Sequence, residues 1–296
     1  MTEKNEEENN NIQCCFCGPI RQCAEFLPAV LNNIEKIGSK IFLNNFAVIV
    51  YYDKSTDNSL SILQQWKKQH PTIDMHICTN TNTNDDSLSM YRTHRISAAR
   101  NKCLKMVSEK YQKCPYIAMM DFDHPNSKMC CVKKLHKYFN PDKLLNKWDA
   151  LSFQTAPHYY DIWALSIAPF CFSYNHFPNN ERFHVIIQQY MDRKLAATDR
   201  LIPCISAFNG FAFYKTSKFA ECYYCGDILT SIRLSNKISF NWIKQHKLAT
   251  NSTRLLFKDY GHVKGNAEDC EHRPFHMQAI YKHGAKIRIS PEIIFK

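Results

Sequence analysis

The segment from Pro115 to Asp123 reads Pro-Tyr-Ile-Ala-Met-Met-Asp-Phe-Asp, an apolar run that ends at two aspartates. Its length and composition are typical of a fully buried strand. The carboxyl ends of such strands form the ligand-binding crevice of open α/β sheets, and alternate residues of an extended chain share a face. Asp121 and Asp123 can therefore converge on Mg²⁺ or Mn²⁺, whose natural companion is a diphosphate. The structural alternative is a polar turn after a strand.

Expected strands and helices alternate around this run. The strands are expected at 12–17, 46–51, 73–78 and 115–120, and the helices at 21–36, 58–69 and 94–111. This order predicts an α/β fold with a mostly parallel central sheet and helices on both faces. Gly18-Pro19 should end the first strand, and Gly38 should lie just past the first helix.

The second half of the chain is less regular. Strands are expected near 150–154 and 208–214, a helix near 182–194, and an aromatic loop over 158–172. Residues 1–11 are acidic and asparagine-rich, and we expect them to be disordered. We expect a single domain over 12–296, with a ligand-binding half, 12–125, and an irregular half, 126–296.

Charge and composition narrow the classes of function. The formal net charge of +11 favours anionic ligands, but the basic residues are scattered, so nucleic acid is not an expected partner. The chain has 7 glycines and neither a Gly-x-Gly-x-x-Gly nor a P-loop pattern, which argues against those nucleotide sites. The positive net charge would instead suit an anionic ligand such as a nucleotide diphosphate.

The 14 cysteines bear on the compartment. No signal peptide and no stretch of ~18 apolar residues is visible, so we expect a cytoplasmic protein without a transmembrane segment. In a reducing compartment the cysteines would act as small buried hydrophobic residues. Cys222 and Cys225 have the spacing of half a zinc site, but no second pair follows.

Polar residues at two points of the first half could contact a nucleotide. Asp53 follows the second expected strand and could accept hydrogen bonds from a ribose or a base, although Ser55 or Asp57 also suits a helix cap.

Arg92, Arg95 and Arg100 enter the third expected helix and could reach phosphates or a base. They do not all share one face, and we favour Arg100 with Asn101.

Two segments of the second half suit sugar binding. Tyr160 and Trp163 could stack on the C–H faces of a sugar while Asp161 accepts hydrogen bonds from its hydroxyls; the alternative is an aromatic cluster in the core. Asn209 could bind a hydroxyl or form a turn. Gly210, expected within a strand, indicates either a bulge or close approach of the backbone to a ligand.

The densest group of potential bases and metal ligands lies near the C-terminus. It contains Glu268, Asp269, Glu271, His272 and His276 within nine residues. A base that deprotonates an acceptor hydroxyl, and a histidine that completes a metal site, could both come from this segment. A solvated acidic turn is the alternative.

Taken together, these segments resemble the GT-A glycosyltransferases, which transfer a sugar from a nucleotide-diphosphate donor. The resemblance covers most of the chain, is closest to enzymes of giant DNA viruses, and extends more distantly to the fungal capsule-associated mannosyltransferases. It is carried in order by Cys17–Cys23, Tyr52–Asp57, Arg100-Asn101, Asp121-Phe-Asp123, Tyr159–Leu165, Ser206–Gly210 and Cys270–His276.

The resemblance implies a role for each segment. Mn²⁺ or Mg²⁺ would be held by Asp123, with Asp121 and a C-terminal histidine (His272 or His276), and would bridge the donor's phosphates. Asp269 or Glu271 would be the base if the chemistry is inverting, and the sequence leaves both that choice and inversion or retention open. The donor-binding residues would be Arg21, Asp53, Ser55, Arg100, Asn101 and Asp121.

The expected activity is therefore hexosyl transfer from a UDP- or GDP-sugar to a glycan or glycoprotein, in a host cytoplasm or virion if the source is viral. The acceptor would lie against Tyr160, Asp161, Trp163, Asn209 and Gly210, and a homodimer is compatible with the sequence. One alternative is a sugar nucleotidyltransferase. That class has a glycine-rich loop with a basic residue after the first strand, and Gly18–Arg21 matches this loop poorly. Another is a non-catalytic protein that binds glycans or nucleic acid.

Overall fold

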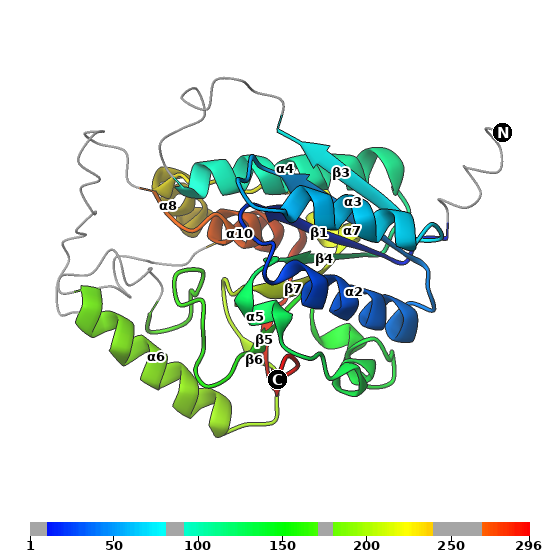
Figure 1. Ribbon diagram of the computed structural model, residues 1–296. Helices are drawn as coiled ribbons and strands as arrows, with labels where there is room; N and C mark the ends of the chain where they lie inside the picture. The colour runs from blue at the N-terminus through cyan, green and yellow to red at the C-terminus, as the bar shows by residue number, and fades with distance from the viewer. Residues whose placement is uncertain (1–10, 81–91, 171–179, 239–267) are drawn as a thin grey trace.

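The computed structural model describes residues 11–80, 92–170, 180–238 and 268–296 (Figure 1). Over these residues the fold is α/β, as predicted. Its strands are β1 (Cys14–Ile20), β2 (Phe46–Tyr52), β3 (Asp74–Thr79), β4 (Tyr116–Met120), β5 (Ala150–Gln154), β6 (Ile202–Pro203), β7 (Phe211–Lys215) and β8 (Ile287–Ile293). Its α-helices are α2 (Leu27–Ile41), α3 (Ser59–Gln69), α4 (Arg92–Lys110), α5 (His124–Ser127), α6 (Asn180–Ala196), α7 (Thr216–Phe219), α8 (Ile228–Lys237) and α10 (His272–His283).

The described strands form one mixed sheet in the order β3-β2-β1-β4-β7-β5-β8-β6. The first four neighbours in this order are parallel, while β7 runs antiparallel to both β4 and β5. β8 is parallel to β5, and β6 at the edge is antiparallel to β8. The sheet is therefore mostly parallel, and its centre is built from both halves of the chain.

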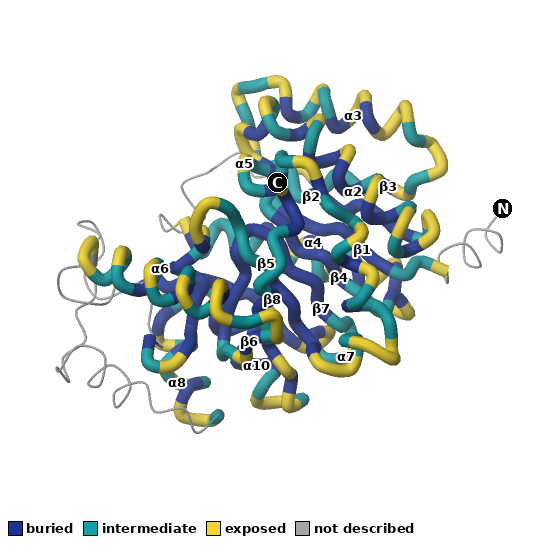
Figure 2. The backbone as a smooth tube through the Cα atoms, turned by 90° about the horizontal axis from the view of Figure 1, so that it is seen from below, coloured by how far each residue is buried: buried dark blue, intermediate teal, exposed yellow. Residues whose placement is uncertain are grey.

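Alternation of side chains along the strands gives the sheet two apolar faces. Phe16 and Val48 face the core that the apolar sides of α2 and α3 cover, whereas Cys17 and Ile49 face the core under α4 and α10. Figure 1 shows α2 and α4 on opposite sides of the strands. In Figure 2 the central strands are buried and the outer turns of α3 and α6 are exposed.

Three predicted boundaries near the N-terminus are wrong. Strand β1 does not end at Gly18-Pro19 but continues to Ile20, because it stays paired with β2 through Ile20 and Tyr52. Helix α2 begins at Leu27 rather than Arg21, because Gln22 has a φ of 54° and the residues after it bond to the loop before α3. Gly38 lies inside α2 and not beyond it.

Gly18 gives a prediction about stability. A Cβ atom at this position would lie 2.2 Å from the carbonyl oxygen of Met120 and 2.7 Å from the ring of Phe122. We expect Gly18→Ala to lower the free energy of unfolding by about 1–3 kcal/mol, measured by urea denaturation. Gly38→Ala is not a neutral control, because it would meet the ring of Phe46. Ser39→Ala, on the more exposed side of α2, is the neutral control. If Gly18→Ala and Ser39→Ala changed the free energy of unfolding equally, the crowding at β1 would be contradicted.

The second half confirms β5 and α6 close to their expected positions, but β7 begins at Phe211 rather than at 208. Asn209 and Gly210 instead form a turn, with φ values of 60° and 82°. A third apolar cluster packs the inner side of α6 against Tyr159, Ile162 and Leu165. This packing fixes the loop that the sequence associates with the acceptor.

The cysteines are mostly buried, as predicted, and no disulfide joins any of those in the described part of the chain. Within those same residues no group of three or more His, Cys, Asp or Glu side chains could hold a metal ion, so the half-site at Cys222 and Cys225 is not extended into a zinc site. In the described segments, no helix combines the length and apolar character needed to cross a bilayer.

Candidate active site

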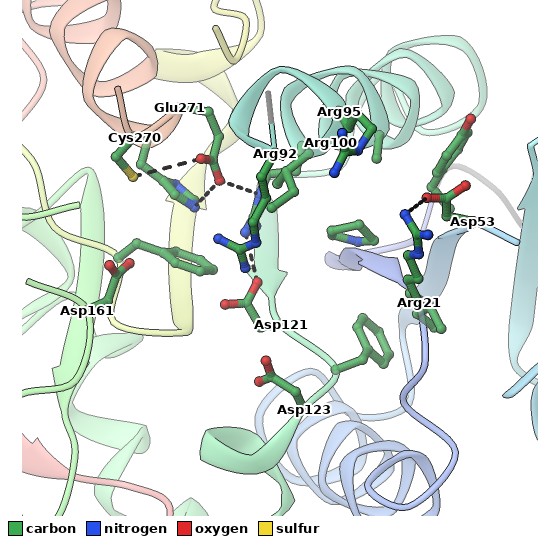
Figure 3. A pocket seen from close by; sticks show the side chains of 18 of the residues that line it. Arg21, Asp53, Arg92, Arg95, Arg100, Asp121, Asp123, Asp161, Cys270 and Glu271 are labelled. Carbon is green, nitrogen blue, oxygen red and sulfur yellow. Dashed lines mark hydrogen bonds and ion pairs between the residues drawn. The ribbon is translucent and has the colours of Figure 1, made fainter. Parts of the chain in front are cut away.

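A cavity of about 560 Å³ opens where β1, β2 and β4 end. Its walls come from both halves of the chain, because the loop after β5 and the start of α10 close it opposite the parallel strands. Figure 3 shows its charged side chains pointing inward. Of the predicted site residues, the cavity brings together Arg21, Asp53, Arg100, Asp121, Asp123, Tyr160, Asp161, Trp163, Glu271 and His272.

The aspartate pair lies at the floor of this cavity, at the end of β4. The backbone N–H of Asp121 donates to the carbonyl of Gly210 at 2.9 Å. The buried amide of Asn126 donates to the carbonyls of Asp121 and Gly210, each at 2.7 Å. These bonds fix the turn after β4, and in Figure 3 the two carboxylates lie next to each other. The carbonyl of Gly210 lies behind the aspartates and Gly210 does not line the cavity, so its contact with an acceptor stays a prediction.

Asp123 lacks a counterpart for its charge. Its Oδ1 is buried and has no hydrogen-bond partner among the described residues. Burial and the neighbouring charge of Asp121 raise the pKa of Asp123 to about 7, against the opposing effect of Arg100 and Arg92. An oxygen ligand in this state fits a divalent cation, which would supply the missing charge. Asp121 and Asp123 are the residues that would hold it.

Arg100 joins the aspartate pair to the C-terminal segment. Its Nη2 donates to Oδ1 of Asp121 at 2.8 Å, and its Nε donates to Oε1 of Glu271 at 3.1 Å. The guanidinium is 3% exposed and lies over the rings of Phe208 and Tyr224, at 4.6 and 5.7 Å from their centroids. Nη1 has no partner in the described part of the molecule, so one donor remains for a ligand.

The structure separates the two candidate bases. Glu271 lines the cavity, and burial raises the pKa of its carboxyl, an effect that Arg100 opposes. Asp269 is fully buried away from the cavity lining. It pairs with Nη1 of Arg273 at 2.5 Å and accepts a hydrogen bond from Ser231 at 2.9 Å. Asp269 therefore makes structural contacts, and of the two candidate bases it is Glu271 that faces the cavity; the role of either as the base stays a prediction.

Removing the charge of Asp269 should destabilise the fold. Asp269→Asn leaves the fully buried guanidinium of Arg273 without its counter-ion, and breaking such a pair costs about 3–5 kcal/mol. Thermal unfolding of the metal-free protein measures this cost, and Asp199→Asn on the surface is the matched control. Full stability combined with lost activity would instead mean that Asp269 acts in the reaction.

The two histidines differ in their positions. His272 lines the cavity, stacked on Phe208 at 3.7 Å, and burial lowers its pKa well below the usual value, so the ring is neutral. His276 does not line it. Its ring nitrogens bond to Ser206 at 2.9 Å and Tyr214 at 3.2 Å, and burial lowers its pKa to about 3. His276 is thus a core residue held by these two bonds, and a role for it as a metal ligand stays a prediction.

At the other end of the cavity, Asp53 follows β2. Its carboxylate lies 3.4 Å from Nη1 of Arg21 and accepts a hydrogen bond from Asn80 at 3.0 Å. Ser55 does not reach the cavity lining. Its hydroxyl accepts from the N–H of Gln22 at 3.0 Å and donates to the carbonyl of Asp53 at 3.1 Å, so it holds the loop after β1. A contact of Ser55 with the nucleotide sugar therefore stays a prediction.

The predicted acceptor residues form the wall after β5. Burial raises the pKa of Asp161 to about 7, while its Oδ1 accepts from the N–H of Ala164. The indole Nε1 of Trp163 is buried without a partner among the described residues. Asn209 is 2% exposed, and its Oδ1 accepts from the N–H groups of Tyr160 and Asp161 at 2.9 and 2.7 Å. Asn209 thus shapes the wall through these bonds, and its predicted contact with an acceptor stays a prediction.

Asn101 is also structural, because its amide exchanges two hydrogen bonds with the backbone of Tyr224, at 2.9 and 2.8 Å. We had favoured Asn101 over Arg92 and Arg95, which both line the cavity. Their place before Arg100 on one helix was the available signal. Phe208 and His184 line the cavity too, and their positions depend on the tertiary packing of distant segments.

Residues 15–145 match the family model described as Glycosyl transferase family 2. No curated protein matches the sequence.

Among solved structures, that of S. aureus TarS 1-349 has a TM-score of 0.44 and 13% identity, over 94% of this chain and 57% of that one. The structure of TarS 1-349 in complex with UDP has a TM-score of 0.38 and 12% identity, over 72% of this chain and 50% of that one. The structure of mannosyltransferase PcManGT from Pyrobaculum calidifontis, in complex with GDP-Man and Mn²⁺, has a TM-score of 0.36 and 11% identity, over 91% of this chain and 69% of that one. This chain thus spans little more than half the length of TarS 1-349.

The finer resemblance to enzymes of giant viruses and fungi is tested by none of these matches and stays a prediction. Residues 15–145 are thus similar to glycosyl transferase family 2, and the described part of the chain has the mostly parallel, helix-covered sheet of a GT-A-like fold.

Proposed function

We propose that this enzyme transfers a sugar from a UDP- or GDP-sugar to a hydroxyl of a glycan or glycoprotein, with a divalent cation at the aspartate pair. The observation that carries the proposal is the buried, unpartnered Oδ1 of Asp123 beside Asp121, at the edge of a cavity otherwise rich in arginine. A cation with a diphosphate completes that charge pattern.

The donor would lie along the ends of the parallel strands. Asp53 and Arg21 would contact the nucleoside at one end, and Arg92 lies near enough to Asp123 to oppose its pKa shift, so it can also reach a phosphate. Asp121 and Asp123 would hold Mn²⁺ or Mg²⁺, which when bound supplies Lewis-acid stabilisation of the departing diphosphate. The free Nη1 of Arg100 would donate to a donor oxygen.

Glu271 is the proposed base. It reaches the cavity from the half of the chain opposite the strand ends, and Arg100 fixes its carboxylate. Removing the proton of an acceptor hydroxyl as it attacks the sugar is the step expected of an inverting enzyme. Asp161, whose carboxyl lies in the same cavity, would accept a hydrogen bond from a hydroxyl of the donor sugar or the acceptor.

Donor binding gives the direct test. Melting temperatures are measured with UDP-, GDP- and CMP-sugars, each with and without Mn²⁺. A ligand at a hundred times its Kd stabilises the fold by about 2.7 kcal/mol, so a UDP- or GDP-sugar should raise the melting temperature, and more so with Mn²⁺. If no nucleotide sugar does so under either condition, the proposed donor site is wrong.

A further inference from the structure

A second hollow, which we name the side groove, opens beside the active-site cavity and has a volume of about 390 Å³. Its walls are α5 with the residue after it, the loop 155–160, and one side of α6. Tyr160 and His184 line both hollows, so the two adjoin each other at these residues. A ligand reacting in the cavity can therefore extend into the side groove.

The groove is held in shape by bonds between its three walls. Nζ of Lys128 donates to the carbonyl of Ala156 at 3.2 Å, which ties the α5 side to the loop. Asp192 on α6 accepts from the N–H of Tyr159 at 3.0 Å and lies 2.7 Å from Nδ1 of His158. The ring of His124 packs edge-on against Phe26. The groove is thus formed before any ligand arrives.

Tyr160 marks the junction of the two hollows. Its side chain is 52% exposed, although its backbone is fixed by Asn209. The next residue, Asp161, faces the active-site cavity. An exposed ring next to an inward carboxylate suits a sugar that stacks on the tyrosine and offers a hydroxyl to the cavity. The following unit of the same glycan would then enter the side groove.

The lining of the side groove differs in charge from that of the cavity. The cavity lining contains five carboxylates together with its cations. The described lining of the side groove contains none, although Asp192 lies just behind it, 2.7 Å from Nδ1 of His158. The lining gathers Lys128 and the rings of His124, His158 and His184 with the neutral donors Thr155 and Gln188. This set of groups complements a negative charge and offers hydrogen bonds to hydroxyls.

We propose that the side groove binds an acidic sugar of the acceptor glycan, one that carries a carboxylate or a phosphate, next to the sugar that receives the transferred unit. This inference rests on the proposed function, because it assigns the groove to the acceptor of that reaction. It narrows the acceptor to an anionic oligosaccharide.

The test compares three probes by NMR titration: methyl glucoside, methyl glucuronide and glucose 6-phosphate. We expect at least one acidic sugar to bind the wild-type protein about fivefold or more tightly than methyl glucoside, as one well-placed charge contact allows. The two acidic probes separate a carboxylate from a phosphate. Equal binding of all three sugars, or displacement of the acidic sugar by equimolar inorganic phosphate, would overturn the inference.

Lys128→Gln should reduce the preference for the acidic sugar to below about twofold, whereas Lys128→Arg should keep it. His158→Gln, at an exposed position, serves as a second variant in case Lys128→Gln does not fold. Lys143→Gln, an exposed lysine outside the groove, is the matched control. If Lys128→Gln and His158→Gln both retain the full preference for the acidic sugar, the groove does not bind the negative charge of that sugar.

Melting temperatures with nucleotide sugars, recorded on the same proteins, report separately on the donor cavity. A wild-type protein that no donor stabilises would contradict the proposed function, whatever the sugars do. A protein that donors stabilise but that shows no preference for acidic sugars would contradict the side-groove inference alone.

Discussion

Asp123→Asn should abolish glycosyl transfer while making the metal-free protein more stable. The amide keeps the size of the side chain but removes the charge that the cation needs, and the loss of that stabilisation should lower the rate by about 10³-fold or more. The loss of rate is measured as sugar transfer or donor hydrolysis, detected through the released nucleotide diphosphate. Asp142→Asn, at an exposed position, is the control.

The stability effect of the same change follows from the raised pKa. Because burial and Asp121 raise the folded-state pKa of Asp123 from 3.8 to about 7, ionisation of its carboxyl disfavours the folded state increasingly between those two pH values. The asparagine variant avoids that cost. Its melting temperature in EDTA should exceed that of the wild type by about 2–4 °C at pH 7–8 and match it near pH 4. A variant that is active, or that is less stable at pH 8, would show that Asp123 does not serve the cation.

Glu271→Gln should lower kcat by about 10²–10⁴-fold and leave donor binding in place. The glutamine can still accept the hydrogen bond from Arg100, but it cannot take a proton from the acceptor. The donor-induced rise in melting temperature, measured beside kcat, separates binding from chemistry. Glu221→Gln, on an exposed glutamate, is the matched control.

Asp161→Asn tests the rival assignment. Asp161 also faces the cavity with a raised pKa, so it is the other carboxyl that could accept the proton. If Asp161→Asn loses the larger factor in kcat and Glu271→Gln retains its rate, the base is Asp161. Loss of donor stabilisation in Glu271→Gln would instead show that Arg100 needs the full charge of Glu271 to hold the donor site.

Local patterns predicted the first half of the sheet and the place of the aspartate pair after β4, because both depend on neighbouring residues. The buried strand β4 and the aspartates after it lie within nine residues of sequence, and the parallel topology then places Asp53 at the same edge of the sheet. Helix α4 and strand β5 were likewise visible from their apolar patterns. The errors there concern where β1 ends and where α2 begins and ends.

The roles of the polar residues near the C-terminus could not be read from the sequence. Asp269 and Glu271 are two residues apart, and only the direction of the chain entering α10 turns the first toward Arg273 and the second toward Arg100. Asn209 is similar, because a polar side chain beside a cavity can bind a ligand or hold a loop, and its four neighbours come from distant segments. Tertiary contacts decide these cases.

The order of strands has a consequence for anyone who would isolate the part that matches the family. The matched segment stops at residue 145, yet β4 within it pairs on one side with β7, which comes after residue 210. A chain that ended at residue 145 would lack β7, so β4 would become an apolar edge strand that can pair with other chains. Such a fragment should aggregate, so the end of the matched segment at residue 145 is not a place where the chain can be cut to give a folded unit.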